Sequence, residues 1–531
     1  MELTRNITTT RLVIIVAAFL TLVGNGKFFS ETVIVFPLQD NVLFIASLSV
    51  WLFSFLSILL LLVCYKYSVK PILIALLLTS SIVSYVANAY GIVLDDNMIT
   101  NTLETNPLEV LDLFSFKFLL YFVILGVIPS YLVYIVHVSS TTWKQQLWSK
   151  TKTITVMAIV FVMVTLSFSK AYTSLAREQR HLRLYVNPTY YLYAIGKYVN
   201  SRFATAAVPF KKIGTDAVID REDQTRKLII MIAGEAARSD RFSLNGYKRT
   251  TNPLLEKEEV ISLNQMYSCG TDTALSVPCM FSSLNKDDYS HAQGKNMSNV
   301  LDVLNYAGVE VLWRDNNSSS KSVASRLPFE DYKSSSINSV CDPECRDQGM
   351  LSDLQKYINA HKEKDIVVIL HTMGSHGPAY YKRYPEQFEK FTPVCETNQL
   401  NECSNEQINN AYDNTIVYTD YVLAKTIELL KNNQDSFKTA MFYMSDHGES
   451  LGENGLYLHG MPYFMAPDEQ IHVGSMLWFD ERFSKDININ ELKSIANKKL
   501  SHDNIFHTLL GLMNIKTTVY NEELDFIPYF K

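Results

Sequence analysis

The sequence predicts a multi-pass α-helical membrane domain followed by an α/β domain outside the cytoplasm. The first observation is that the chain of 531 residues carries its longest apolar runs in its first third. The second is that, after Lys227, short apolar runs alternate with amphipathic segments, a pattern typical of a sheet with helices on both faces. We therefore expect residues 1–170 to form the membrane domain, residues 171–226 a linker and residues 227–531 the exported domain.

Five apolar runs are candidates for membrane helices, since a bilayer requires about 20 apolar residues. The four clear runs are residues 42–64, 72–93, 118–138 and 153–169. A soluble protein would need an implausibly large core to bury all four. The fifth run, residues 11–29, is interrupted by a Gly-Asn-Gly-Lys segment. We favour a first membrane helix there, and the alternative is a signal peptide.

Charge placement predicts the orientation, because basic residues near helix ends tend to stay cytoplasmic. The basic residues fall in alternate connections: Arg5 and Arg11, then Lys66 and Lys70, then Lys144, Lys150 and Lys152. The other connections are acidic, with Lys27 and Lys117 as exceptions. Five spans with an inside N-terminus place the chain after about Lys170 outside the cytoplasm.

Six of the seven cysteines form three close couples in the exported part, and Cys64 lies in a membrane run. The couples are Cys269 with Cys279, Cys341 with Cys345, and Cys395 with Cys403. Such local couples indicate three disulfides and an oxidising compartment. A zinc knuckle is disfavoured because no couple has Cys-x-x-Cys spacing. The net charge of −6 and the lack of basic clusters give no reason to expect nucleic acid.

The expected linker contains a tyrosine-rich segment, residues 182–203, that is interrupted by Pro188. Tyrosine favours the membrane interface, where its ring is half buried and its hydroxyl stays hydrated. We expect this segment to lie along the outer membrane surface, and an ordinary amphipathic packing helix is the alternative.

Four apolar runs of the exported domain end in polar, metal-competent groups. The runs are residues 227–233, 309–313, 365–370 and 439–445. Ligands bind beside the C-terminal ends of strands in open α/β sheets, so these groups should converge. Carboxylate and imidazole ligands without thiolate suit a catalytic zinc ion.

The first-choice zinc ligands are Glu235, Asp446 and His447, each directly after a predicted strand. A lone Asp-His pair usually lies exposed on the surface without a functional role, but this pair follows a buried-looking strand and precedes a glycine. Three further histidines either complete a second metal position or handle protons and phosphate: His371, His376 and His459.

The segment "TALSVPCMF" predicts a helix with Thr273 near its N-terminus, where backbone N–H groups favour an anion. A disulfide between Cys269 and Cys279 would fix that turn. A zinc ion on the threonine oxygen would lower its pKa and create a nucleophile able to attack phosphorus. The alternative is that Thr271 or Thr273 only caps the helix.

The chain resembles the phosphoethanolamine transferases that modify lipid A of Gram-negative outer membranes, including the mobile colistin-resistance enzymes. The motifs that carry the resemblance are "GEAARSDRFSLNGY", "SCGTDTALSVPCMFS", "WRDNNSSSK", "HTMGSHGPAYYKRYP", "FTPVC", "AYDNT" and "SDHGESLGENGLYLHG". It covers nearly the whole chain, and implies an exported domain of the alkaline phosphatase and sulfatase type. It also implies a bacterial inner-membrane protein with its catalytic domain in the periplasm, which we expect to be a monomer.

The resemblance further implies roles for individual residues. Thr273 would become phosphoethanolamine-modified, and Glu235, Thr273, Asp446 and His447 would hold the catalytic zinc. His376 and His459 would contact a second zinc or the donor headgroup, with Asn317, Lys321 and His371 nearby. One departure is Asp272, a position where relatives often have a small residue, which adds a negative charge beside the nucleophile.

The implied reaction has two steps. Thr273 attacks the phosphorus of phosphatidylethanolamine, diacylglycerol leaves, and a phosphate of lipid A attacks the phosphoethanolamine-threonine intermediate. Zinc and Lys321 would neutralise charge on the phosphoryl oxygens, and His376 or His459 would protonate the leaving alkoxide. The product would carry less negative charge, which would confer polymyxin and colistin resistance.

An acidic outer loop, residues 94–112, lies on the same side of the membrane as the exported domain. Asn97, Asn101 and Glu104 in this loop are candidates to recognise the ethanolamine ammonium or to cover the site. A solvated connecting helix is the equally weighted alternative.

Rival functions remain to be separated by experiment. The acceptor can be lipid A, a core sugar of lipopolysaccharide or another glycan. A phosphatase- or sulfatase-type hydrolase would use water instead, and a glycerol-phosphate polymerase shares five spans and a threonine nucleophile. A membrane-anchored zinc sensor would have no catalysis. The number of zinc ions, one or two, is also left open.

Overall fold

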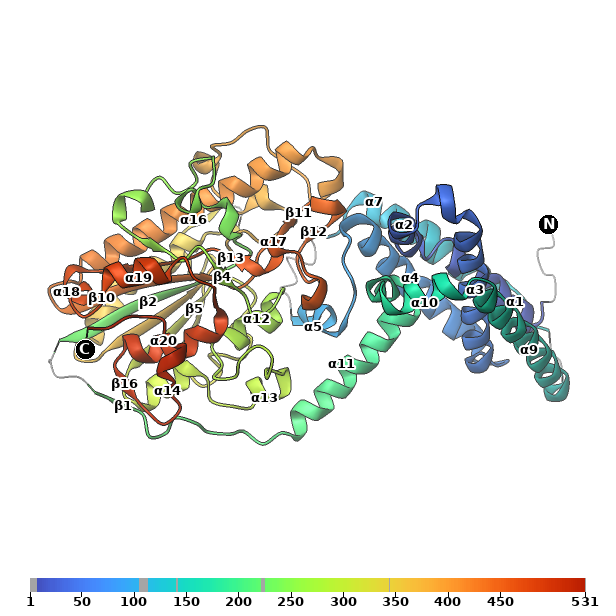
Figure 1. Cartoon of the computed structure of the whole chain (residues 1–531), viewed down its shortest axis with the longest axis horizontal. Helices are drawn as coiled ribbons and strands as arrows, with labels where there is room; N and C mark the ends of the chain where they lie inside the picture. The colour runs from blue at the N-terminus through green and yellow to red at the C-terminus, as the bar shows by residue number, and fades with distance from the viewer. Residues whose placement is uncertain (1–6, 105–112, 140–141, 221–224, 343, 531) are drawn as a thin grey trace. The chain divides into compact units, whose positions relative to one another are not determined.

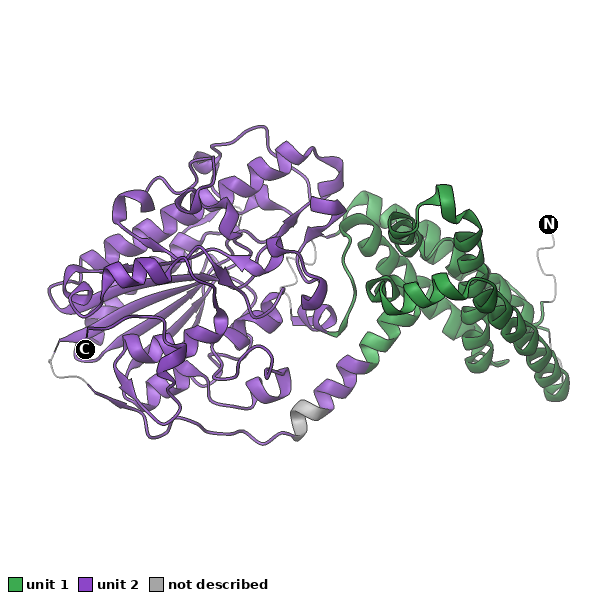
Figure 2. Ribbon diagram, in the orientation of Figure 1, with its two compact units in different colours: residues 1–96, 114–196 green, residues 97–113, 197–531 purple. Residues whose placement is uncertain are grey.

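The computed structural model describes residues 7–104, 113–139, 142–220, 225–342 and 344–530. These form two compact units, shown in different colours in Figure 2. Unit 1 comprises residues 1–96 and 114–196, and unit 2 comprises residues 97–113 and 197–531. The segment expected to link two domains, residues 171–226, is therefore divided between the units, and part of the acidic outer loop belongs to unit 2.

Unit 1 is built from helices. They are α1 (Thr9–Leu22), α2 (Gly26–Val35), α3 (Leu38–Val63), α4 (Val69–Tyr90), α7 (Phe116–Phe122), the π-helix η1 (Val123–Val127), α8 (Ile128–Ile135), α9 (Trp143–Ser167), α10 (Ser169–Arg177) and the 3₁₀ helix η2 (Arg180–Tyr185). The helix α11 (Thr189–Ala207) begins in unit 1 and ends in unit 2. The tyrosine-rich segment is thus mostly regular helix, starting just after Pro188.

Within the described residues, four helical segments are long and apolar enough to cross a membrane, which confirms the four clear predicted spans. They are α3, α4, α9 and the continuous segment from α7 to α8. The pair α1 and α2 makes a fifth span if it counts as one, with a bend of 49°. Asn25 lies at the bend and donates hydrogen bonds to the carbonyl oxygens of Leu20 and Asn187, each at 2.8 Å. The interrupting Gly-Asn-Gly segment therefore bends this span at a defined point.

Unit 2 contains a seven-stranded sheet, visible in Figure 1. In order across the sheet its strands are β3 (Ile261–Ser262), β14 (Ser475–Phe479), β10 (Phe437–Ser445), β2 (Arg226–Gly234), β9 (Ile366–His371), β5 (Glu310–Asp315) and β6 (Phe329–Asp331). The five strands from β10 to β6 are parallel, whereas β14 and β3 are joined by antiparallel pairings. The predicted α/β architecture is confirmed.

The register of the central strands aligns their C-terminal ends. Ser445 pairs with Gly234, Ala233 pairs with His371, and His371 pairs with Asp315. The strands are nearly continuous apolar runs because helices bury them on both faces. The residues that follow these strands therefore emerge side by side at one edge of the sheet.

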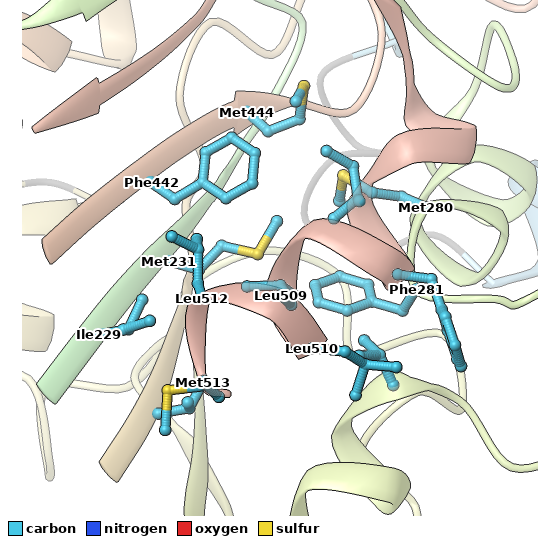
Figure 3. Packing of buried hydrophobic residues seen from close by; sticks show 14 of the residues in the cluster. Ile229, Met231, Met280, Phe281, Phe442, Met444, Leu509, Leu510, Leu512 and Met513 are labelled. Carbon is cyan, nitrogen blue, oxygen red and sulfur yellow. The ribbon is translucent and has the colours of Figure 1, made fainter. Parts of the chain in front are cut away.

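Helices cover both faces of the sheet. The helices of unit 2 that follow β2 are α12 (Thr273–Met280), α13 (His291–Lys295), α14 (Val300–Tyr306), α15 (Leu354–Ala360), α16 (Asn405–Lys431), α17 (Asp468–Ile471), α18 (Glu481–Ser484), α19 (Ile489–Ile495) and α20 (Ile505–Leu512). The long helix α16 packs on β10. On the other face, Ile229 and Phe442 of the sheet pack with Phe281, which directly follows α12, and with Leu509 of α20, as Figure 3 shows. This core anchors α12 against the strands that carry the polar groups.

The remaining strands of unit 2 form small sheets. β1 (Val218–Ile219) pairs with β16 (Ile515–Lys516), β11 (Ser450–Leu451) with β12 (Tyr457–Leu458), and β7 (Cys341–Asp342) with β8 (Glu344–Cys345), while β4 (Met266–Tyr267) lies between β13 (His472–Val473) and β15 (Leu500–Ser501). Because β1 joins β16, the chain before β2 is part of unit 2 rather than a free linker.

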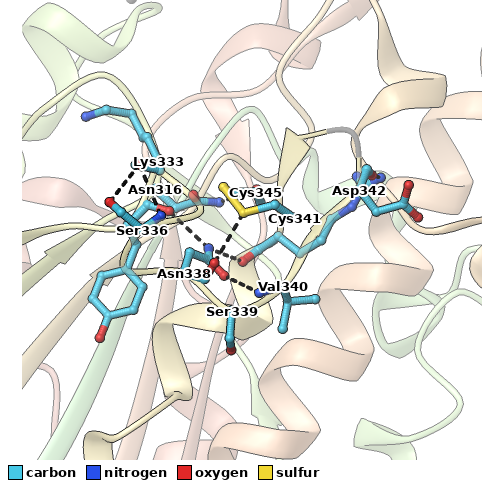
Figure 4. The surroundings of a disulfide bond; sticks show 12 residues. Asn316, Lys333, Ser336, Asn338, Ser339, Val340, Cys341, Asp342 and Cys345 are labelled. Atoms are coloured by element: carbon cyan, nitrogen blue, oxygen red, sulfur yellow. Dashed lines mark hydrogen bonds between the residues drawn. A yellow bond between two sulfur atoms is a disulfide. The ribbon is translucent and has the colours of Figure 1, made fainter.

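All three predicted disulfides are present: Cys269–Cys279, Cys341–Cys345 and Cys395–Cys403. Cys64 is a buried free thiol. The surroundings of Cys341–Cys345 are shown in Figure 4, where Asn338 accepts a hydrogen bond from the backbone of Val340 at 2.9 Å. Asn338 also donates to the carbonyl oxygens of Tyr332 and Arg346, each at 3.0 Å, so this small hairpin is tied to the loop after β6.

Candidate active site

The centre of the site lies at the C-terminal edge of the sheet. Glu235 directly follows β2, and Asp446 and His447 directly follow β10. The three side chains are fully buried, and their ligand atoms lie within 4.8 Å of one another. Because β2 and β10 are adjacent parallel strands in register, residues far apart in the chain meet at one point: the Ala236 N–H donates to Asp446 Oδ1 at 3.2 Å across a separation of 210 positions.

Thr273 lies in the same cluster as the first residue of α12. Its Oγ1 donates to Glu235 Oε2 at 3.0 Å and lies 3.3 Å from His447 Nε2. The capping residue is Asp272, which accepts a hydrogen bond from the Leu275 N–H at 3.0 Å. Neither threonine caps the helix, so the alternative interpretation of Thr273 as an N-cap is wrong and its hydroxyl faces the acidic cluster instead.

Several contacts fix the α12 turn against the sheet. Ser276 donates a short hydrogen bond to the Asp446 carbonyl oxygen. The ring of His502 accepts from the Cys269 N–H at 3.1 Å and lies 3.1 Å from the Ser445 carbonyl oxygen. Burial lowers the pKa of His502 to about 3, so this ring stays neutral and can accept. Together with the Cys269–Cys279 bond, these contacts hold the nucleophile's turn in place.

A glycine allows the close approach of a second loop to Glu235. Gly374 has φ of +49°, and a Cβ there would lie 2.7 Å from the Glu235 carbonyl oxygen. Asp347 holds the same loop by accepting from the N–H groups of Met373 and Gly374, at 2.8 and 3.0 Å. The loop that carries His376 is thus packed directly onto the residue that follows β2.

The cluster is electrostatically coupled. Burial opposes ionisation of Glu235, yet the adjacent His447 imidazole holds the pKa of Glu235 well below its usual range. Burial, with the neighbouring Glu235 carboxylate, raises the pKa of Asp446 to about 7. Burial alone would lower the pKa of His447, but Asp446 and Glu235 outweigh it and raise that pKa to about 10. Two acids therefore share buried space with a single imidazolium.

The donor set fits a metal ion. Among the described residues, Glu235 Oε1 and Asp446 Oδ2 are buried without a hydrogen-bond partner, and they lie 3.1 and 3.5 Å from His447 Nε2. Buried carboxylate oxygens are normally hydrogen-bonded, so such underpaired oxygens beside an imidazole nitrogen indicate a cation site. Two carboxylates, one imidazole and one hydroxyl together offer four ligands of the kinds that zinc accepts.

A second group of potential ligands adjoins the first. Glu235, His376 and His459 form one set within 4.8 Å, and His447, Glu449 and His459 form another. His459 donates from Nδ1 to Glu449 Oε2 at 2.7 Å, while Tyr380 donates to Glu449 Oε1 at 2.7 Å. This carboxylate fixes the ring so that the other nitrogen of His459 is the one available for a ligand or a proton.

The structure does not group His371 with those ligands. Its Nδ1 donates to Asp315 Oδ2 at 2.9 Å, and Trp313 Nε1 donates to the same oxygen at 3.0 Å. Burial would lower the pKa of His371, but the Asp315 carboxylate prevails and raises it. His371 Nε2 is buried without a hydrogen-bond partner. Within the described residues, His371 belongs to no metal-binding group, so we assign it a place beside the cluster rather than in it.

Asn317 and Lys321 follow β5 and behave differently. Asn317 Nδ2 donates to Glu235 Oε2 at 2.8 Å, so it touches the central cluster directly. Lys321 Nζ donates to the carbonyl oxygens of Glu104 and Ser318, at 2.9 and 3.2 Å. Burial raises the pKa of Asp272, and the Lys321 cation opposes part of that rise.

The acidic outer loop contributes helix α5 (Asp96–Glu104), whose residues from Asn97 onward belong to unit 2. Asn101 is 6% exposed, and Asn97 is half-buried. The Glu104 carboxylate accepts from Lys295 at 2.9 Å and from Arg202 at 3.1 Å. The Met98 sulfur lies 2.9 Å from where a Cβ on Gly460 would be, so α5 packs beside the loop that carries His459.

Sequence reasoning missed three supporting residues. Glu449 lies inside the motif "SDHGESLGENGLYLHG", ten residues before His459, and this spacing was the signal that could have predicted their contact. Asp315 lies just after the predicted strand at residues 309–313. The expectation that polar groups after strands converge could therefore have predicted its pairing with His371. His502 had no local signal, because its role depends on a contact 233 positions away.

Fold and site together define a class of protein: a membrane-anchored enzyme of the sulfatase and alkaline phosphatase type with a threonine beside a buried cluster of two carboxylates and an imidazole. A sequence profile described as "Sulfatase" matches residues 227–515, and one described as "Phosphoethanolamine transferase EptA/EptB" matches residues 52–203. Phosphatidylethanolamine transferase Mcr-1 of Escherichia coli is 42% identical over 529 residues, 97% of each chain. Mcr-2 of Escherichia coli is 41% identical over 525 residues, 97% of this chain and 96% of that one.

A solved structure matches nearly the entire chain. It is the integral membrane protein lipooligosaccharide phosphoethanolamine transferase A (EptA) from Neisseria meningitidis, with a TM-score of 0.95, 33% identity, and coverage of 98% of this chain and 99% of that one. The chain therefore belongs to the EptA and Mcr family of phosphoethanolamine transferases. The stated resemblance, the membrane location and the two-part fold are confirmed.

Proposed function

We propose that this protein transfers phosphoethanolamine from phosphatidylethanolamine to a phosphate group of lipid A, through a phosphoethanolamine-Thr273 intermediate. The observation that carries the proposal is the position of the Thr273 hydroxyl, 3.0 Å from Glu235 and 3.3 Å from His447 at the N-terminus of α12. The active site is periplasmic, where both lipids can reach it from the membrane. The product's lower negative charge would reduce polymyxin and colistin binding.

Zinc is the metal we propose for this site, held by Glu235, Thr273, Asp446 and His447. When bound, zinc lowers the pKa of the hydroxyl and neutralises charge on the phosphoryl oxygens. His376 and His459, with Glu235, are the residues suited to a second ion or to the donor headgroup. Glu449 and Tyr380 keep the His459 ring oriented for either task.

In the first step the Thr273 oxygen attacks phosphorus, the new P–O bond forms, and the P–O bond to diacylglycerol breaks. Thr273 gives up its proton to Glu235, whose Oε2 accepts its hydrogen bond, and the free N–H groups at the start of α12 favour the negative charge that develops. The departing alkoxide takes a proton from His376 or His459, because its high pKa makes acid assistance valuable. Asn317 steadies Glu235 by donating to Oε2, so the carboxylate stays in place as the hydroxyl reacts.

In the second step a phosphate oxygen of the acceptor attacks the same phosphorus, the P–O bond to Thr273 breaks, and Glu235 returns the proton so that Thr273 leaves as its hydroxyl. The histidine that donated a proton takes one from the attacking phosphate group, which returns the site to its starting state. Buried surroundings keep water from competing, since the side chains of Glu235, Asp446 and His447 are fully enclosed. Lys321 can neutralise charge on the acceptor side.

Mass spectrometry tests the proposal directly. Lipid A from cells that express the protein should carry phosphoethanolamine, and Thr273→Ala should abolish the adduct while the protein still folds. Thr271→Ala is the matched control, since the Thr271 hydroxyl donates only to the Met461 carbonyl oxygen among the contacts of the described residues, at 2.7 Å. Adduct formation that persists in Thr273→Ala would contradict the covalent mechanism. Release of free phosphoethanolamine without a lipid adduct would favour a hydrolase instead.

The acceptor can also be a core sugar or another glycan, and the meningococcal relative is named for lipooligosaccharide. The position of the adduct in the mass spectrum separates these acceptors. Recognition of the donor ammonium by Asn97, Asn101 and Glu104 is a further hypothesis. Glu104→Gln tests it, because unchanged affinity for phosphatidylethanolamine would rule out recognition by this carboxylate.

A further inference from the structure

Three cations of unit 2 gather at the C-terminal end of α5, outside the metal cluster. Lys295 Nζ and Arg202 Nη2 both donate to one oxygen, Glu104 Oε1, at 2.9 and 3.1 Å. Lys321 Nζ donates to the backbone oxygen of the same residue at 2.9 Å. Side chains from α11, α13 and the loop after β5 thus converge on one residue, Glu104. We call Arg202, Lys295, Lys321 and Glu104 the basic cluster.

The basic cluster carries more positive than negative charge. Within the described part of the chain, Glu104 is the only acid that forms an ion pair with Lys295 or Arg202. Lys295 and Arg202 against this one carboxylate leave an excess of one positive charge among the ion pairs of the described residues. The side chains of Lys295 and Glu104 are only 14% and 19% exposed, so solvent screens their charges weakly, whereas Arg202 is 49% exposed and its charge is screened more strongly. A phosphate group, which is negatively charged at neutral pH, matches the sign of this excess.

A buried donor without a partner lies in the same place. The hydroxyl of Tyr289 is buried and has no hydrogen-bond partner within the described residues. Glu104 is close enough to raise the pKa of Tyr289, although burial is the larger cause. A side chain at Gly294 would clash with the Tyr289 ring, so this glycine lets the tyrosine lie against α13 beside Lys295. Buried hydroxyls are normally paired, and an incoming phosphate oxygen would pair this one.

The basic cluster is connected to the reacting centre through the loop after β5. Lys321 belongs to the cluster, and Asn317, four residues earlier, donates to Glu235. The loop after β5 therefore contacts both the basic cluster and the reacting centre.

We propose that Lys295, supported by Arg202 and Tyr289, binds the phosphate group of the acceptor lipid for the second transfer step. This inference rests on the proposed phosphoethanolamine transfer and assigns its acceptor subsite. Charge-assisted hydrogen bonds from lysine and arginine to phosphate are short and strong, and the tyrosine hydroxyl adds geometric selection. The lipid donor, which is consumed in the first step, does not require Lys295.

The two half-reactions separate these roles. Full-length protein in phosphatidylethanolamine nanodiscs is first followed by intact-protein mass spectrometry as Thr273 becomes modified. Phosphorylated lipid A is then added, and the loss of the modification is measured against acceptor concentration. Lys295→Met should leave the first rate unchanged and raise the half-saturating acceptor concentration at least about tenfold, the loss expected for one charge-assisted hydrogen bond. Lys295→Arg should recover part of the effect.

Two further variants complete the design. Tyr289→Phe removes only a hydroxyl and should raise the half-saturating concentration about threefold or more. Lys493→Met, an exposed lysine of α19, is the matched control and should behave as wild type. Unchanged acceptor dependence in Lys295→Met, or an equal loss in both half-reactions, would overturn the inference. If wild-type protein never becomes modified on Thr273, the proposed function fails as well, so the two failures are distinguishable.

Discussion

The two edges of the central sheet differ in whether their buried charged groups have hydrogen-bond partners. At the C-terminal edge, Glu235 Oε1 and Asp446 Oδ2 are buried without hydrogen-bond partners. At the N-terminal edge, the buried Lys227 donates to the Leu512 carbonyl oxygen at 2.6 Å and to Asn514 Oδ1 at 2.8 Å. Asp365 completes that edge by accepting from the Lys227 N–H at 2.7 Å.

The difference shows which edge serves stability and which serves chemistry. A buried polar group with good partners costs little and holds the fold together, whereas an underpaired acid destabilises the metal-free protein. The C-terminal edge tolerates this penalty because a cation can satisfy the acids. Substitutions at the two edges should therefore have opposite signatures in activity and stability.

The largest expected effect follows removal of one acid at the C-terminal edge. Glu235→Gln should lower the transfer rate by about 1,000-fold or more, because it removes one of the proposed metal ligands and the acceptor of the Thr273 hydrogen bond. Metal content by elemental analysis should fall, yet the Tm of the chelator-treated protein should stay equal or rise. Glu256→Gln, at an exposed position, is the control. A large drop in Tm without loss of metal would contradict the comparison.

The opposite pattern is expected at the N-terminal edge. Lys227→Met should reduce the free energy of unfolding by about 2–3 kcal/mol, because two buried acceptors lose their donor. The turnover of the folded fraction should be unchanged. Chemical denaturation and single-turnover transfer measure the two quantities, with the exposed Lys356→Met as the reference. Lost turnover at unchanged stability would break the proposed division between the edges.

Burial raises the pKa of both Asp446 and Asp525 to about 7. A smaller effect, on the pH dependence of the free energy of unfolding, distinguishes the two residues. Asp525 accepts from Tyr520 at 2.9 Å and from the Ile527 N–H at 3.0 Å, away from the metal site. Its folded-state pKa lies above the unfolded value, so its stabilisation is present below about pH 4 and is lost as pH rises to about 7.

In saturating zinc, which keeps Asp446 ionised, unfolding free energy should still fall by about 2 kcal/mol between pH 5 and 8 on account of Asp525. Asp525→Asn should flatten this dependence, as denaturant titrations at several pH values can show. A dependence that survives in Asp525→Asn would assign it to another group.

The site residues that directly follow buried strands could be predicted from the sequence. Glu235, Asp446 and His447 follow buried strands, and parallel strands in register bring their ends together. The basic cluster escaped prediction because Arg202, Lys295 and Lys321 come from two helices and a loop with no common periodicity. The bend between α1 and α2 was signalled by Gly-Asn-Gly, but its partner Asn187 lies 162 residues away. Long-range partners of this kind leave no mark in local sequence.

The cross-links of the exported unit have a consequence for how the protein matures. Each disulfide spans no more than ten positions, and each cysteine's partner is its nearest exported neighbour in the chain. Oxidation in order of emergence from the membrane would thus give the native pairing at once, with no reshuffling of mismatched bonds. The loop that bears Thr273 can be closed while hundreds of residues that later surround it are still being made.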